Sequence, residues 1–384
     1  MKQLGRNNGS TVERKYLWAL GLIAPGCSML PSQLVLWTGM RVFWWIGPVV
    51  ILVIIPLLDW IVGEDGTNPA DEDYERLSND KFYRALTFLF LPVQLIGLII
   101  ACWLWAHHEL SVIDKIGLAT SVGLAGGIGI NAAHELGHRS EELERWLAKI
   151  ALAQSLYGHF YVEHNRGHHV RVATPDDPAS ARLGESLWFF FPRTVIGSFR
   201  SAVELERDRL RRKGSGWWTY QNSMLQSYAV SVVLIGGLLI GFGWAILPYL
   251  LLQGVLSIAL LETVNYIEHY GLLRAKKANG SWARCSPADS WNSDRLVTNV
   301  FLFHLQRHSD HHANPGRRYQ TLRTTDESPQ LPGGYASMVV LALVPWIWRS
   351  VMDPKVLAHY DGDITRCNIS PRKRERILAA YATV

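Results

Sequence analysis

Histidine is concentrated in four short stretches of this sequence. Ten of the 14 histidines lie in the segments HELGH, HNRGHH, NYIEHYG and HLQRHSDHH. The neutral imidazole nitrogen is a good ligand for iron, copper, zinc and nickel, and imidazoles gathered without nearby cysteine are typical of metal sites that use nitrogen rather than sulfur. The pattern therefore predicts a metal centre built from histidine.

The spacing within the stretches matches one face of a helix, because residues three and four apart are neighbours on a helical surface. His134 and His138 can therefore face one ion, and a helix through residues 304–312 would place its histidines in one row. In residues 164–169 the same spacing is followed by an adjacent histidine. On a helix that neighbour points about 100° away, where it can reach a second ion.

The candidate ligands outnumber the places around one ion. A transition metal usually has about four to six ligands, so nine histidines predict two ions. For His159, His304 and His359 we expect exposure to solvent or an indirect role beside a ligand. The nine candidate ligands are His134, His138, His164, His168, His169, His269, His308, His311 and His312.

Acidic residues directly beside these histidines are candidates to hold the imidazole rings. A ligating histidine usually donates its other ring N–H to a carboxylate or carbonyl, which fixes the tautomer and the ring direction. For each acid, an ordinary salt bridge is as good an explanation as a hydrogen bond to a ligating histidine. An acid can also bridge or cap a metal. The candidate acids are Glu135, Glu163, Glu268 and Asp310, and His304 is a further candidate for an indirect role beside a ligand.

The four cysteines are far apart in the sequence and include no Cys-x-x-Cys pair. This spacing does not fit a disulfide framework, a zinc ribbon or an iron–sulfur site. Electrons for a redox reaction at the histidine site must therefore come from outside this chain.

Long runs without Asp, Glu, Lys or Arg predict the elements that position the histidines. Four runs are each about one bilayer crossing long, and the fifth, of 48 residues, is long enough for two. The sequence therefore predicts an all-α polytopic membrane protein with six transmembrane helices. These are expected at about residues 16–38, 42–62, 85–106, 114–136, 222–241 and 244–266.

The remaining sequence is expected to form a helical cap that carries the metal site, within a single catalytic domain of residues 1–384. The metal-binding portions are residues 134–213 and 267–384. Residues 143–161 read as one amphipathic helix. Residues 335–348 are apolar but too few to cross a bilayer, so we expect them to lie on its surface.

Two smaller features of the spans also carry predictions. Asp59 stands near the end of the second span and is expected to lie at the membrane interface. Glycine is frequent in the fourth span, where it is expected to permit close helix packing rather than to leave room for a ligand. These glycines are Gly123, Gly126, Gly127 and Gly129.

The distribution of basic residues predicts the orientation. Lys and Arg are concentrated in residues 139–213 and after residue 269, and the connections at 39–41, 108–112 and 241–243 nearly lack them. The positive-inside rule therefore places both termini, the cap and all four histidine stretches in the cytoplasm. The apolar run after the basic N-terminus is too long for a signal peptide. Basic sequence between spans does not indicate nucleic-acid binding.

HELGH, EHNRGHH and LQRHSDHH resemble the three histidine boxes, HxxxH, HxxxHH and HxxHH, of the membrane di-iron family that contains fatty acyl desaturases, hydroxylases and alkane monooxygenases. NYIEHYG and the run LQRHSDHHANPGRRYQTL resemble the integral-membrane alkane 1-monooxygenases in particular. The resemblance covers residues 15–350, approximately. It implies that the nine histidines bind two non-haem iron ions.

The same resemblance implies terminal hydroxylation of medium-chain n-alkanes with O2, in the inner membrane of a bacterium. Electrons would come from rubredoxin, itself reduced by a rubredoxin reductase. The sequence contains no rubredoxin cysteine pairs, so we expect a separate donor. A basic cytoplasmic surface suits an acidic carrier, because complementary charge speeds encounter. The alkane is expected to reach the metals from the bilayer, between the spans.

Three other functions are compatible with parts of the pattern. A fatty acyl desaturase or hydroxylase would use the same boxes and the same metal. HELGH is also the HExxH signature of zinc proteases, but one zinc would leave most of the histidines unexplained. A metal transporter would need ligands near the bilayer midplane, whereas these lie at one surface. Zinc also lacks the redox chemistry that an unactivated C–H bond requires.

Overall fold

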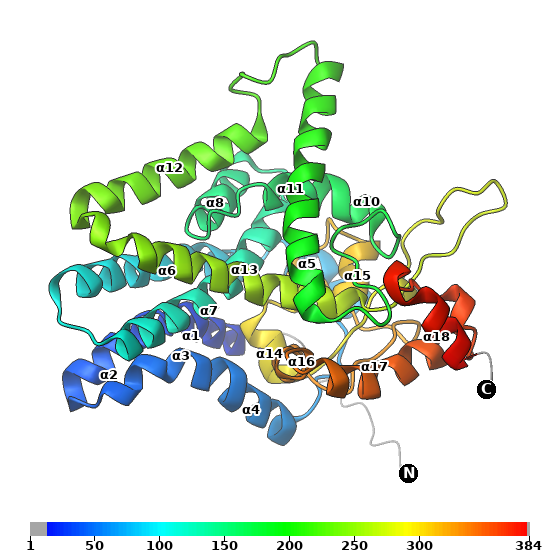
Figure 1. The fold of residues 1–384 in the computed structure, drawn as a ribbon, viewed down its shortest axis with the longest axis horizontal. Coiled ribbons are helices and arrows are strands. Elements are labelled where there is room, and N and C mark those ends of the chain that lie inside the picture. The colour runs from blue at the N-terminus through cyan, green and yellow to red at the C-terminus, as the bar shows by residue number, and fades with distance from the viewer. Residues whose placement is uncertain (1–13, 382–384) are drawn as a thin grey trace.

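The computed structural model describes residues 14–381 (Figure 1). Within that range the secondary structure is helical, and no strand is formed beyond isolated bridge pairs. The predicted all-α fold class is therefore confirmed. The basic N-terminal stretch before residue 14 and the last three residues, which were predicted to be cytoplasmic, lie outside the described residues.

Five helices of the described chain are long and apolar enough to cross a membrane, and a bent helix pair is a sixth candidate. The pair consists of Lys15–Gly26 and Leu30–Thr38, which meet at 70°. Counted as one span, the pair brings the total to the six that were predicted. The five others are Arg41–Val62, α6 (Lys81–His107), α7 (Val112–Gly137), α12 (Ser223–Phe242) and α13 (Leu247–His269), the last preceded by a turn from Trp244.

The first two spans are built from short helical pieces because proline interrupts them. Proline has no N–H and clashes with the preceding turn, so it kinks or breaks a helix when it lies inside one. The first span joins the 3₁₀-helix Lys15–Leu22, α1 (Ile23–Gly26) and α2 (Leu30–Thr38). The second contains the 3₁₀-helix Arg41–Trp45, α3 (Ile46–Val49), the π-helical turn Val50–Ile54 and α4 (Ile55–Val62).

Polar caps set the starts of the long spans. The Asp80 side chain accepts a hydrogen bond from the backbone N–H of Phe82, so α6 begins four residues before the predicted position. Ser111 and Asp114 form a reciprocal capping box at the start of α7, and Asn222 caps α12. These caps satisfy backbone donors that would otherwise lack partners at the helix ends.

Helix α7 is the centre of the bundle and packs against α6 and α13, as Figure 1 shows. Its glycines face these neighbours. A Cβ atom on Gly123 would lie 2.7 Å from Leu256 Cβ of α13, and one on Gly129 would lie 2.3 Å from the Gln94 amide of α6. Gly126 and Gly127 also face α13. The packing role predicted for these glycines therefore agrees with the structure.

This contact gives a stability prediction. We expect Gly123→Ala to destabilise the folded chain by about 1–3 kcal/mol, because the added methyl group would overlap both Leu256 Cβ and the Gln253 carbonyl oxygen. Thermal unfolding of the purified protein in detergent measures the effect. Gly236→Ala in α12 is the matched control, since nothing lies within 4 Å of its Cβ position. Equal melting temperatures for the two variants would contradict tight α7–α13 packing.

The remaining helices are shorter, apart from α11, and surround the ends of the spans. In Figure 1, α10, α15, α17 and α18 lie toward the right, at the end of the bundle where α13 ends. These helices are α5 (Tyr74–Ser78), α8 (Glu142–Ala153), α9 (Phe160–Glu163), α10 (His169–Arg171), α11 (Leu187–Arg212), α14 (Leu296–Phe301), α15 (His308–Ala313), α16 (Tyr335–Ala342), α17 (Pro345–His359) and α18 (Arg374–Tyr381).

Three local predictions need correction. The single helix expected over 143–161 is interrupted after α8, where Leu156 adopts a left-handed backbone with φ 58°. The apolar stretch 335–348 is not among the candidate spans, as predicted, but it breaks into α16 and the start of α17, and α16 packs on α13. Asp59 is buried rather than interfacial, because its carboxylate accepts hydrogen bonds from Thr298 of α14.

Candidate metal centre

Segments from four parts of the chain meet at one end of the bundle. The C-terminal ends of α7 and α13 approach the helical segment formed by residues 160–171 and the short helix α15. Each contributes histidines, and the nine predicted ligands form two adjoining groups within the described chain. The structure therefore brings together residues that are up to 178 positions apart in the sequence.

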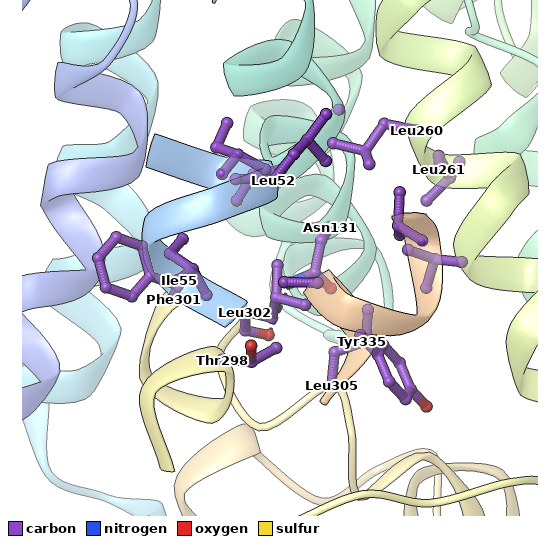
Figure 2. A pocket seen from close by; sticks show the side chains of 16 residues that line it. Leu52, Ile55, Asn131, Leu260, Leu261, Thr298, Phe301, Leu302, Leu305 and Tyr335 are labelled. Carbon is purple, nitrogen blue, oxygen red and sulfur yellow. Dashed lines mark hydrogen bonds between the residues drawn. The ribbon is translucent and has the colours of Figure 1, made fainter. Parts of the chain in front are cut away.

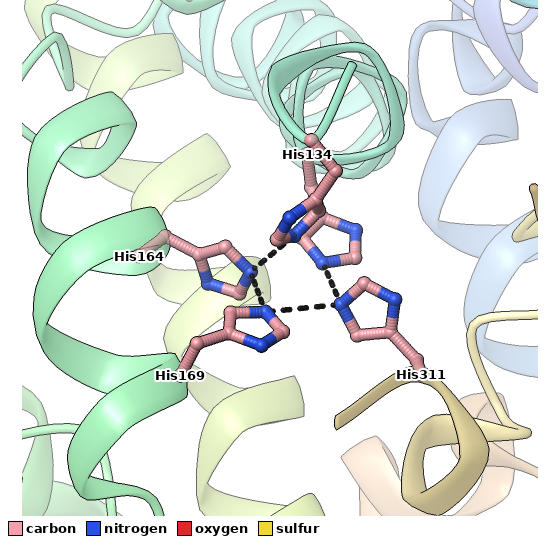
Figure 3. Close-up of side chains that lie close together, drawn as sticks. His134, His164, His169 and His311 are labelled. Atoms are coloured by element: carbon pink, nitrogen blue, oxygen red, sulfur yellow. Dashed lines mark hydrogen bonds between the residues drawn. The ribbon is translucent and has the colours of Figure 1, made fainter. Parts of the chain in front are cut away.

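Five of the histidines form the first group, called here the five-histidine cluster: His134, His138, His164, His169 and His311 (Figure 3). One nitrogen of each lies within 4.8 Å of all the others. Their Nε2 atoms are in close contact: 2.8 Å between His134 and His311, and 3.1 Å between His138 and His164. His169 Nε2 lies 3.0 Å from His164 Nε2 and 3.1 Å from His311 Nε2.

The other four form the four-histidine cluster: His168, His269, His308 and His312. His308 Nε2 lies 2.8 Å from His312 Nε2 and 3.3 Å from His269 Nε2. His168 Nε2 is buried and has no hydrogen-bond partner in the described structure. The two clusters are neighbours, because the ring centres of His169 and His312 are 4.4 Å apart.

The donor set fits metal ions. Nitrogens that bind one ion at ~2.1 Å lie roughly 3.0–3.4 Å from each other, and the contacts in both clusters are close to this range. Burial, followed by the neighbouring imidazoles, lowers the pKa of six of these histidines well below the ordinary value. These rings are therefore neutral and keep a free lone pair. They are His138, His164, His169, His308, His311 and His312.

A π-helical turn decides how the second histidine stretch is shared. Residues His164–His168 form this wider turn, so His164 and His169, five residues apart, face the same cluster. His168 faces the other cluster. The spacing alone had paired His164 with His168, as on a regular helix, and that pairing is wrong. Within this turn, position 167 suits glycine, because a Cβ there would lie 2.5 Å from the Glu163 carboxylate.

The last histidine stretch is only partly helical. Helix α15 begins at His308, so His308 and His312 share the four-histidine cluster and His311 reaches the other. His304 precedes the helix in a left-handed conformation with φ 55°. Its Nδ1 lies 2.9 Å from the Tyr319 carbonyl oxygen and its ring packs on Trp18. His304 is thus buried away from both clusters rather than exposed or aligned with them.

The histidines outside the clusters have other surroundings. His159 was expected at the surface or beside a ligand, but it is buried with its Nδ1 2.8 Å from the Tyr228 hydroxyl. His359 is partly buried near Trp291. His107 and His108 are exposed at the C-terminal end of α6.

Three of the four neighbouring acids form ion pairs with arginine, the alternative that the sequence left open. Two of these pairs are Glu163 with Arg171 at 2.7 Å and Asp310 with Arg317 at 2.6 Å, and Glu135 pairs with Arg139. Glu268 differs from them. It is buried with one oxygen 3.2 Å from His308 Nε2, so it borders the four-histidine cluster directly.

Asp177 holds a histidine of the four-histidine cluster and was missed by the sequence analysis. Its Oδ2 lies 2.9 Å from His168 Nδ1, and both groups are buried. The contact directs His168 Nε2 toward the cluster, which is the usual carboxylate–histidine arrangement at metal sites. Burial raises the pKa of Asp177, but His168 and Ser180 outweigh it, so the pKa falls below the ordinary value. The search had covered only acids adjacent to a histidine, and Asp177 is nine residues after His168.

An apolar pocket extends from the spans toward the clusters (Figure 2). Its cavity volume is about 40 Å³, and its walls come from the second span, α7, α13, α14, α16 and the loop after α14. A smaller pocket beside it is lined by His134, His164, His308 and Glu268. The two pockets share Asn131, Leu261, Val264 and Leu305 as lining residues.

Comparisons with known proteins agree with this arrangement. Residues 115–342 match a family model described as fatty acid desaturase. The chain is 44% identical to an alkane 1-monooxygenase of Acinetobacter baylyi over 377 residues, which cover 96% of this chain and 91% of that protein. It is 42% identical to an alkane 1-monooxygenase of Pseudomonas putida over 369 residues, 96% of this chain and 92% of the relative. An alkane 1-monooxygenase 1 of Alcanivorax borkumensis is 42% identical, with 96% and 91% covered.

Proposed function

The chain belongs to the alkane 1-monooxygenases, within the fatty acid desaturase family, and from this premise we propose that it is a membrane-bound monooxygenase that converts n-alkanes to 1-alkanols with O2. Medium-chain n-alkanes are the proposed substrates. The observation that carries the proposal is the convergence of nine histidines, in two adjoining clusters, beside an apolar pocket. A site of this kind would combine a redox-capable metal with an apolar lining that suits a hydrocarbon.

The proposed cofactor is a pair of non-haem iron ions. The five-histidine cluster would hold one ion and the four-histidine cluster the other. Iron bound by nitrogen ligands supplies the O2 activation that an unactivated C–H bond requires. Glu268 is the only one of the four adjacent acids that borders a cluster rather than an arginine, so it is the proposed carboxylate neighbour of the second ion.

The chain's own residues would orient the substrate. The lining of the apolar pocket is almost entirely hydrocarbon, and among the described residues that form it only Asn131, Thr298 and Tyr335 have polar side chains. The smaller pocket continues it to His134, His164 and His308. An alkane that lies along this path would present its end to the clusters, so terminal selectivity follows from the narrow junction.

The junction gives a prediction. We expect Leu261→Phe to slow octane hydroxylation roughly tenfold or more, because the larger ring narrows the passage that both pockets share and displaces the chain end from the metals. Iron content should be unchanged. Leu251→Phe, at a half-exposed position on the same helix, is the matched control. If the two variants retain equal activity, the alkane does not pass Leu261.

We also propose rubredoxin as the electron donor, reduced in turn by a rubredoxin reductase, and a cytoplasmic location of the clusters in a bacterial inner membrane. The chain has a formal net charge of +5. A surface hollow lined by Arg284, Arg317 and Arg323 lies beside the loop that follows α15, and only one acid, Asp71, lines it. His138 and His169 are partly exposed, whereas the four-histidine cluster is wholly buried. Electrons would therefore enter through the five-histidine cluster.

Docking by charge predicts a salt effect. Raising ionic strength should slow electron delivery from rubredoxin more than it slows turnover with a small uncharged reductant, because salt screens the attraction between an acidic donor and the basic hollow. Stopped-flow oxidation of reduced rubredoxin over a salt series measures the rate. Equal slowing with both reductants would count against this docking.

One experiment tests the function itself. The purified full chain should contain two iron ions and should convert octane to 1-octanol with reduced rubredoxin, and ¹⁸O from labelled O2 should appear in the alcohol. A desaturase would instead form a double bond in a fatty acyl substrate and leave octane unchanged. One zinc ion with peptide cleavage would contradict the proposal completely.

A further inference from the structure

A further pocket, which none of the cluster histidines lines, lies where α8, the C-terminal end of α11 and the first turn of α12 meet. Its cavity volume is about 460 Å³, and it opens to the surface. Its lining is rich in cations and aromatic rings. The basic residues are Arg145, Lys149, Arg166, Arg209 and Lys213.

Positive charge exceeds negative charge in this basic pocket. The five cations face only two acids, Glu142 in the lining and the buried Glu206 behind it, which leaves a local formal charge of +3. Glu206 pairs with both Arg166 and Arg209. Among the described residues, the other three cations, Arg145, Lys149 and Lys213, form no ion pair. The pocket thus has unbalanced cations that an anion can neutralise.

Lys149 is the most constrained of these cations. It is 5% exposed, and its ammonium group lies 4.4 Å from the centre of the Trp146 ring and 4.9 Å from that of Tyr161. Burial and then the positive charges of Arg145 and Arg166 lower the pKa of Lys149 to about 8. Cations held this close together repel one another, so a bound anion would relieve the repulsion.

The pocket's position indicates which kind of anion it meets. Ser223 and Gln226 line it from the first turns of α12, one of the candidate spans, so the pocket lies at the level where that span leaves the membrane. Trp218 and Tyr220, just before the helix, are 87% and 83% exposed. Exposed Trp and Tyr at the end of a span are typical of the headgroup layer of a bilayer.

We propose that the basic pocket binds the phosphate of an anionic phospholipid headgroup. A cluster of about four to eight Lys and Arg residues beside the end of a transmembrane helix suits such headgroups. The arginine guanidinium groups and Lys149 would contact the phosphate, and Trp146 and Tyr220 would contact the glycerol and upper acyl chain. Free inorganic phosphate shares the first of these contacts but not the second. The site does not depend on the proposed enzymatic function.

The test is native mass spectrometry of the purified, delipidated full chain, titrated with phosphatidylglycerol or with phosphatidylcholine of the same acyl chains. We expect one phosphatidylglycerol to bind in preference to phosphatidylcholine. The double variant Arg145→Gln/Lys213→Gln removes two exposed cations, so it should fold normally and bind phosphatidylglycerol roughly 10- to 30-fold more weakly. Lys276→Gln/Lys277→Gln, in an exposed loop elsewhere, is the matched control and should bind as the original chain does.

Two further measurements separate the other possible occupants. Millimolar inorganic phosphate should not displace the lipid, and complete displacement would assign the pocket to a free phosphate instead. Equal phosphatidylglycerol binding by the double variant and the control overturns the proposal. If the double variant also slows electron delivery from rubredoxin, the pocket is a protein-docking surface. Lys149→Gln gives a second, independent removal of charge and should weaken lipid binding in the same direction.

Discussion

Replacing His269 by alanine is expected to remove one metal ion per chain and to lower alkane hydroxylation at least about 100-fold. His269 is completely buried at the end of α13, and its Nε2 lies 3.3 Å from His308 Nε2 in the four-histidine cluster. Loss of a residue that merely supports a ligand usually costs about 10- to 100-fold in metal affinity or activity. Loss of a proposed ligand, from a cluster with only four imidazoles, should cost more.

The expected pattern is specific to this cluster. Iron content measured by elemental analysis should fall from two ions per chain to one, because the five-histidine cluster does not include His269. Mössbauer spectra of ⁵⁷Fe-loaded protein should lose the signal of one iron environment. His107→Ala, which removes an exposed histidine at the far end of α6, should leave both measurements unchanged. Full iron content together with full activity in His269→Ala would show that His269 is not a ligand.

The identity of the histidines could be predicted from the sequence, but their division between two clusters could not. Charge-free runs and histidine spacing were sufficient to predict the spans and the nine candidates, because burial of apolar helices and ligand chemistry depend on residue type. The division depends on backbone geometry. The π-helical turn moves His169 into the place that His168 would have on a regular helix, and no residue type in HNRGHH specifies that turn by itself.

Other differences arise from contacts between distant segments. His304 turns away from the clusters because its Nδ1 lies beside the Tyr319 carbonyl oxygen and its ring packs on Trp18. Asp59, which looked like an interfacial residue, accepts hydrogen bonds from Thr298, 239 positions later in the chain. A single sequence without the fold does not reveal such partners. The glycines of α7 are different, because small residues at helical spacing already indicate a packed face.

The two clusters also differ in their surroundings, which affects what each can do. Every histidine of the four-histidine cluster is buried, and Glu268 and Asp177 both approach it. The five-histidine cluster has two partly exposed rings and no such carboxylate among its described contacts. Negative charge beside the four-histidine cluster would stabilise the higher oxidation state of a metal ion held by that cluster. We therefore expect substitution of Asp177, whose carboxylate contacts His168, to affect metal binding.

We expect Asp177→Ala to weaken iron binding at the four-histidine cluster about 10- to 100-fold. The variant leaves His168 Nδ1 without its carboxylate partner, so the imidazole becomes a weaker donor and its ring direction is no longer fixed. Asp177→Asn should have a smaller effect, because an amide oxygen still accepts the hydrogen bond but carries no charge. Competition with a chelator, followed by Mössbauer spectroscopy, measures the loss of that iron separately from the other.

A structural role for Asp177 must be distinguished from this one, since its carboxylate also accepts hydrogen bonds from the Ala179 backbone and the Ser180 hydroxyl. Ser180→Ala is the matched control: it removes the hydroxyl contact with the Asp177 carboxylate but keeps the contacts with the Ala179 backbone and with His168. If the two alanine variants lose iron equally, Asp177 acts through the loop and not through the imidazole. If only Asp177→Ala loses iron, and its melting temperature without metal matches that of Ser180→Ala, the carboxylate acts on the metal through His168.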